Sequence, residues 1–277
     1  MNLLTMKISL LACAMACLLI SGCATTGIED RTRIGAIPLA ASHSDMVFSL
    51  TTPARLAARC DKDANCKLRD LAAEGFARQV ARVNAALQIG VQERYPDLAA
   101  TVPGLSGKKF DVYVVEGDSL ESSSSANGRI ALSAQLGAWQ PYDEWTAFVI
   151  AREMGHIIAR HHEENSSAGL VTSIILNILL PGSALLKKAI SAGAQSVASG
   201  SKEDVQMLEA DAIARDILTA SGYSVDILSL SLMVAPVTAN NNRWSSNFRK
   251  SSDNFLRAAP VAELVTTAVA ATSLDSE

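Results

Sequence analysis

Apolar residues recur at helical spacing in two long stretches of the chain. The first extends from Leu68 to Tyr95 and predicts an amphipathic helix that packs on the rest of its domain. Its apolar positions are Leu71, Phe76, Val80, Val83, Leu87 and Val91. The second extends from Asp143 to Asn165 without a proline or a β-type alternation, and it predicts one buried helix.

Shorter runs between these helices have the composition of strands. Phe110 to Val115 predicts a strand, Ser122 to Gly128 a small polar loop, and Arg129 to Ser133 the partner strand. The chain has 277 residues, of which 49% are hydrophobic and 19% are charged. This is enough for one sizeable α-rich globular domain. A formal net charge of −4 gives no indication of a nucleic-acid partner.

The first 22 residues have the pattern of a bacterial lipoprotein signal peptide. Lys7 precedes an uncharged apolar run, residues 8–20, that is too short to span a membrane. Residues 20–23 read I-S-G-C, a lipobox, so cleavage before Cys23 would leave an acylated N-terminus and a stable bilayer anchor. Ala24, in place of Asp, indicates sorting to the outer membrane with the domain in the periplasm. The alternative is an ordinary secretory signal with an unrelated cysteine.

The remaining chain divides into two parts. Residues 23–53 have little periodicity and predict a lipidated N-terminus and tether, which includes His43, and residues 54–277 form the predicted domain. Cys60 and Cys66 are predicted to form a disulfide in this oxidising compartment, worth about 2 kcal/mol. Residues 166–200 are nearly uncharged and predict a lid of helix, break and helix; the alternative, a membrane span at 168–186, is interrupted by a proline and a glycine.

Three blocks resemble peptidase family M48, a family of gluzincin zinc endopeptidases. Residues 148–162 (F-V-I-A-R-E-M-G-H-I-I-A-R-H-H) resemble its active-site helix, and residues 208–211 (L-E-A-D) with 220–223 (A-S-G-Y) resemble its second signature. Residues 114–136 resemble the strand, loop and strand that precede the helix. The resemblance implies an α+β, mostly α fold, with the active-site helix under a small antiparallel sheet whose edge strand can hold an extended polypeptide.

The family motif is H-E-x-x-H, in which the histidines bind zinc and the glutamate is the general base. Here Arg152 replaces the first histidine, while Glu153 and His156 occupy the other positions. Guanidinium has no lone pair for a metal, and it stays positively charged. The third ligand position, four residues before Asp211, is Met207, whose neutral thioether is a poor zinc ligand.

Nearby residues do not offer replacement ligands by their spacing. Glu209 is two residues beyond the ligand position and is expected on another side of its helix, and His161 and His162 are expected off the face of His156. Arg152 is therefore predicted to replace the charge of the metal in a buried ion pair with Glu153 or with Asp211, a second-shell position.

Two function hypotheses follow from these residues. The first is a non-catalytic pseudo-peptidase without a cofactor, a lipoprotein that binds polypeptide or an outer-membrane assembly component. The alternative is an active zinc metalloendopeptidase of envelope protein quality control that uses a non-standard ligand set. No other catalytic motif is present, neither G-x-S-x-G nor a P-loop.

Overall fold

The computed structural model describes residues 23–24, 33–34, 40–57, 68–102, 105, 109–139, 142–166, 200–234 and 242–258. The predicted signal peptide, the Cys60–Cys66 disulfide and most of the predicted lid lie outside these residues. The named elements are β1 (Cys23–Ala24), β2 (Arg33–Ile34), α2 (Ala40–Thr51), α3 (Leu68–Arg94), α4 (Leu98–Thr101), β3 (Asp111–Val115), β4 (Ser122–Ser124), β5 (Arg129–Ser133), η3 (Ala134–Trp139), α5 (Asp143–Ile158), α8 (Gly200–Ala220), α9 (Val225–Val234) and α10 (Arg243–Ala258).

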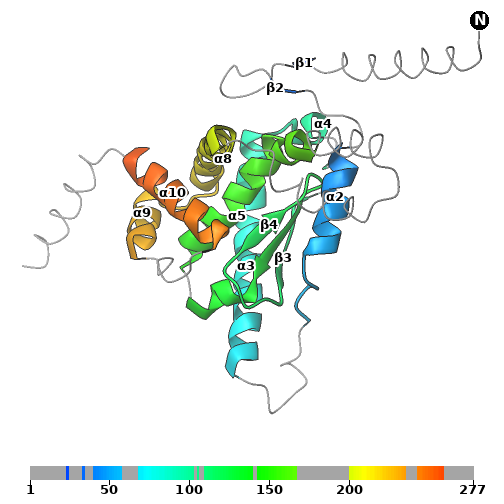
Figure 1. Ribbon diagram of the computed structural model, residues 1–277. Helices are drawn as coiled ribbons and strands as arrows, with labels where there is room; N and C mark the ends of the chain where they lie inside the picture. The colour runs from blue at the N-terminus through cyan, green and yellow to red at the C-terminus, as the bar shows by residue number, and fades with distance from the viewer. Residues whose placement is uncertain are drawn as a thin grey trace, which may run out of the picture.

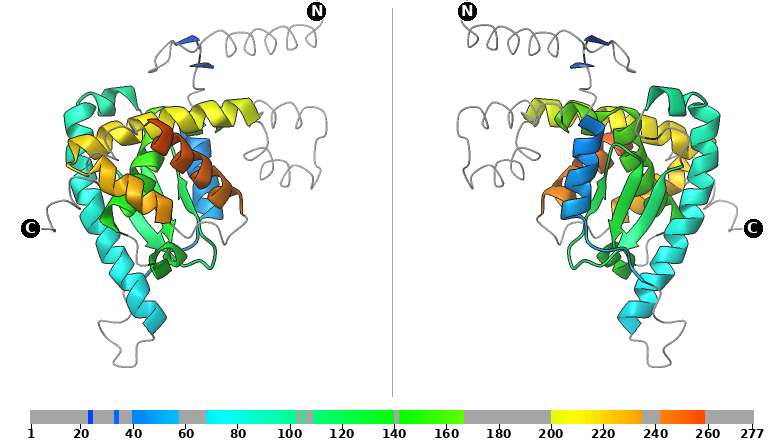
Figure 2. Two further views of the ribbon diagram at one scale, coloured as in Figure 1. Left: turned by 90° about the vertical axis from the view of Figure 1, so that its left-hand side faces the viewer. Right: turned by 90° about the vertical axis from the view of Figure 1, so that its right-hand side faces the viewer.

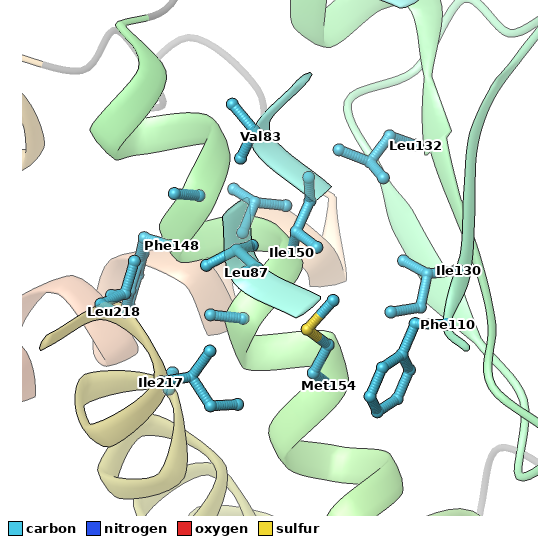
Figure 3. Close-up of a cluster of buried hydrophobic side chains, with 14 of the residues drawn as sticks. Val83, Leu87, Phe110, Ile130, Leu132, Phe148, Ile150, Met154, Ile217 and Leu218 are labelled. Atoms are coloured by element: carbon cyan, nitrogen blue, oxygen red, sulfur yellow. The ribbon is translucent and has the colours of Figure 1, made fainter. Parts of the chain in front are cut away.

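Helix α5 lies at the centre of the domain, in contact with the sheet and with helices α3 and α8 (Figure 1). Phe148, Ile150 and Met154 of α5 are fully buried because apolar side chains of these elements pack against them. Figure 3 shows them between side chains of α8, α3 and the sheet. The helix at 68–95 is confirmed as α3, and its predicted apolar positions are buried except Leu71, which is 47% exposed.

The sheet confirms the α+β, mostly helical fold class, but it is mixed rather than antiparallel. Its strand order is β3-β5-β4, with β3 parallel to β5 and β4 antiparallel to β5. The difference arises at Ser122–Ser124, which was predicted as loop and forms the edge strand β4. Because β4 and β5 make the hairpin, β5 returns in the direction of β3. Serine-only strands carry no apolar alternation that would reveal them in the sequence.

The predicted tether at 23–53 is wrong over its second half, where helix α2 packs on the sheet. Phe48 lies in a cluster with Val115 and Ala131, on the sheet face opposite the main core. Asp45 accepts hydrogen bonds from Arg129, and the Ser44 hydroxyl accepts one from the Ala126 amide. The domain therefore begins near residue 40, and His43 belongs to α2. Figure 2 shows α2 against the strands.

Within the described part of the chain, no helix combines the length and the apolar character that crossing a bilayer requires. The stretch 168–186, for which a span was the alternative reading, lies outside that part. Both the lid and the span therefore stay predictions.

Candidate functional site

The central helix ends earlier than the sequence pattern predicts. Helix α5 ends at Ile158, residues 159–160 form a turn, and a new helical segment occupies 161–166. Arg160 has a φ of 60°, the left-handed conformation that reverses the direction of the next side chains. The expectation of one helix to Asn165 is therefore wrong, and the break brings the histidines that follow it back toward the site.

The predicted charge pair at the first ligand position is confirmed with Asp211 as the partner. Arg152 Nε lies 3.3 Å from Asp211 Oδ1, and each side chain is 7% exposed. Burial raises the pKa of Asp211, and the positive charge of Arg152 opposes that shift. Neither Arg152 Nε nor the Asp211 oxygens make an aligned hydrogen bond, so the contact is mainly electrostatic. The pair joins α5 to α8.

Glu153 is held by two serines of the edge strand. Its carboxylate accepts hydrogen bonds from Ser122 Oγ at 2.7 Å and from Ser124 Oγ at 2.5 Å. Ser122 Oγ also lies 2.7 Å from Trp244 Nε1. An indole N–H can only donate, so Ser122 accepts from Trp244 and gives its own proton to Glu153. The general-base position is thus bound to β4 by hydroxyl groups.

His156 contacts the histidine that follows the helix break. The Nδ1 atoms of His156 and His161 are 2.9 Å apart, and His161 Nε2 lies 3.1 Å from Glu209 Oε2. A carboxylate only accepts, so His161 donates its Nε2 proton to Glu209. Burial, followed by the charges of His161 and Arg152, lowers the pKa of His156 well below its usual range. His156 is therefore a neutral imidazole near neutral pH.

These contacts correct two expectations from spacing. His161 was expected off the face of His156, and Glu209 on another side of its helix. In one continuous helix the His161 side chain would point away from His156. The turn at Arg160 changes its direction, so that the two rings are in contact. Glu209 is buried, 8% exposed, and lines the same side as His161.

His162 completes the polar contacts beneath the edge strand. Its Nε2 atom is 2.8 Å from Ser124 Oγ, and its ring lies 6.3 Å from that of His156. Burial and the charge of His161 lower the pKa of His162 to about 4, so this ring is also neutral. Because Ser124 donates to Glu153, His162 must donate to Ser124 from Nε2. We call Glu153, Ser122, Ser124, His162 and Trp244 the serine network.

The donor set does not fit zinc. Arg152 contributes a fixed positive charge close to His156, where a dication would have to bind. Met207, at the third ligand position, is buried and 2% exposed, with only a thioether to offer. Over the described ranges, no group of three or more histidine, cysteine, aspartate or glutamate side chains is arranged to hold a metal ion. We therefore derive no reaction step through a metal.

Sequence reasoning found the positions on α5 and α8 but missed the serine network. The spacing of Ser122 and Ser124 was a usable signal, since residues i and i+2 of a strand share a face. A run of serines without apolar alternation instead has the composition of a loop. Trp244 had no signal in the sequence, because its contact with Ser122 depends on how α10 packs across the domain.

Comparison with known proteins agrees with the three sequence blocks. The family model described as Peptidase family M48 matches residues 86–243, more than half of the chain. This range contains the sheet, α5 and α8, and with them every site residue from Ser122 to Asp211, while Trp244 lies just beyond it. No curated protein matches the chain.

Proposed function

The chain belongs to peptidase family M48, and from this membership we propose that its domain is a non-catalytic relative that binds extended polypeptide. The observation that carries the proposal is the buried pair of Arg152 and Asp211 at the first ligand position. Arg152 supplies a positive charge at this position but no lone pair for a metal. It supports the view that the fold was kept while the hydrolytic site was lost.

The state of Glu153 supports the same proposal. In an active member this carboxylate would need to take a proton from water. Here both carboxylate oxygens accept hydrogen bonds from serine hydroxyls of β4. Each serine already has a second partner, Trp244 for Ser122 and His162 for Ser124. Glu153 therefore serves to fix the edge strand above α5.

The edge strand is the binding element that we propose. Strand β4 lies at the edge of the sheet, because within the described residues β5 is its only neighbour in the order β3-β5-β4. An edge strand has free backbone groups that can pair with an added extended chain. The proposed partners are an unfolded polypeptide or an outer-membrane assembly component, and no nucleic acid.

Location completes the proposal. We propose that acylated Cys23 anchors the chain to the outer membrane, with the domain in the periplasm. The I-S-G-C lipobox and Ala24 support this location. A place at the membrane suits a domain that captures polypeptides in transit to it.

The test uses the soluble chain that begins after Cys23 and fluorescein-labelled β-casein as the unstructured polypeptide. We expect saturable binding by fluorescence anisotropy and no cleavage on gels, with or without added zinc. Cleavage that requires zinc and is abolished in Glu153→Gln would contradict the proposal and support the alternative, an active metalloendopeptidase of envelope protein quality control. Absence of both binding and cleavage would also contradict it.

A further inference from the structure

We propose that the beginning of α10 is a latch that closes the edge strand and regulates polypeptide binding. The latch consists of Asn242 and Trp244, at the start of the helix. This inference rests on the proposed function, since it concerns access to the same edge. It follows from contacts between two segments that lie about 120 residues apart in sequence.

The direction of the backbone groups in β4 follows from its pairing with β5. Ser133 donates its amide proton to the Glu121 carbonyl, and Ser125 donates its amide proton to the Arg129 carbonyl, at 3.0 Å each. In an antiparallel ladder, alternate residues point their backbone groups toward the partner strand. Residues 121, 123 and 125 therefore face β5, while 120, 122 and 124 face the free edge.

Asn242 occupies one of these free-edge positions. Its Nδ2 atom donates to the Leu120 carbonyl at 2.8 Å, and its Oδ1 atom accepts from the Ser245 amide at 2.8 Å. The second bond is the N-cap of α10, so the same side chain begins the helix and closes the edge. An added strand would need the Leu120 carbonyl for its own backbone bond. Asn242 and an incoming polypeptide therefore compete for one acceptor.

Trp244 holds the neighbouring free-edge residue through its side chain. It donates to Ser122 Oγ, which in turn donates to Glu153. Its ring stacks on Phe248 with centroids 5.1 Å apart, and Phe248 is fully buried against α5. The latch thus connects the edge strand to the general-base position through one hydroxyl group.

Polar contacts also join this end of α10 to α8. Arg243 binds Glu203 and Lys250 binds Asp204 in exposed pairs, and the half-buried Asn247 donates to Glu203 as well. Exposed ion pairs contribute little to stability. Phe248 and Phe255 are buried in the core and would keep the rest of α10 in place. Opening then requires the first turn of the helix to separate from β4, which also exposes Ser245.

The test is a double variant, Asn242→Asp with Trp244→Phe, in the soluble chain. Aspartate keeps the cap on the Ser245 amide but cannot donate to Leu120, and phenylalanine keeps the stacking on Phe248 but cannot donate to Ser122. Ser246→Ala, on the exposed side of the same helix, is the matched control. Because the bond that competes for the Leu120 carbonyl and the bond that holds Trp244 to β4 are both removed, labelled β-casein should bind about tenfold more tightly to the double variant.

Hydrogen exchange of residues 120–125 is the second measurement, and it should be faster in the double variant than in the parent and in Ser246→Ala. Equal casein affinity in parent and double variant would overturn the latch and leave the proposed function standing. If neither the parent nor any variant binds casein, the proposed function is wrong. The latch is then also wrong, because there is no polypeptide binding for it to regulate, whatever the exchange rates are. If Ser246→Ala also binds casein more tightly than the parent, the gain in affinity comes from a general loosening of α10. This result would also overturn the latch.

Discussion

Arg152 is the residue on which the account of this site depends most. Its guanidinium is buried beside Asp211 and close to His156. Its positive charge therefore compensates the charge of the Asp211 carboxylate and repels a metal cation. Removing one member of a buried pair leaves the other charge without compensation and typically costs about 3 to 5 kcal/mol. We therefore expect Arg152→Ala to lower the melting temperature markedly in a thermal melt. A variant as stable as the parent would show that the pair does not contribute to the stability of the fold.

The reverse change is to rebuild the ligand positions. Arg152→His combined with Met207→Glu removes the cation and places two ligand types beside His156. We expect this double variant to be less stable than the parent in chelator and to recover when zinc is added, because only zinc restores the positive charge. The measurement is a melt under both conditions, with Met207→Glu alone as control. Equal melting temperatures with zinc and with chelator would contradict the expectation.

His162 gives the domain a defined sensitivity to acid. Its pKa is lowered to about 4 in the folded chain, whereas an unfolded histidine titrates near ~6.5. Between these values the unfolded chain binds more protons, so stability that is complete above the unfolded pKa is lost as the pH falls toward the folded one. His162→Asn should abolish this loss of unfolding free energy, which amounts to about 3 kcal/mol. Urea unfolding of both chains across this pH range tests it, and parallel curves would refute it.

At the scale of elements, the contact between α5 and α8 fixes the site. A Cβ atom added at Gly155 would lie 2.5 Å from the Ala210 carbonyl oxygen, a backbone atom that cannot move aside alone. Gly155→Ala should therefore force the helices apart and destabilise by about 1 to 3 kcal/mol. Gly75→Ala in α3, where an added Cβ meets nothing within 4 Å, is the control and should stabilise slightly. Similar unfolding free energies for the two variants would contradict this packing.

The elements also show how far the sequence could predict the structure. Helix α3, the beginning of α5 and strand β5 were predictable because each has a clear apolar period or alternation. Helix α2 was not, since its position is set by contacts with Arg129, far along the chain. Strand β4 was not, because three serines carry no apolar alternation. The break of α5 depends on the conformation of Arg160, for which no glycine or proline gave a signal. The charge pair was predictable from chemistry, while the histidine contacts depended on that break.

At the scale of the whole molecule, the proposed anchor at Cys23 is close in sequence to the domain. Because α2 is part of the domain, only 16 residues (25–40) follow Ala24 up to its start, and a fully extended chain of this length spans at most about 60 Å. We expect Cys23→Ser to release the protein from the membrane fraction after a carbonate wash. If the variant stays with the membrane, the segment 166–200 would have to be the anchor. Fractionation of parent and variant side by side decides between the two.

The central claim is that this member of the family does not use zinc, and the most direct test is the metal content of the purified chain that begins after Cys23. Elemental analysis after dialysis against buffer with free zinc should find no stoichiometric zinc, because Arg152 and Met207 occupy two ligand positions. His156→Ala should give the same value as the parent. About one zinc per chain, lost together with proteolytic activity in His156→Ala, would contradict the account.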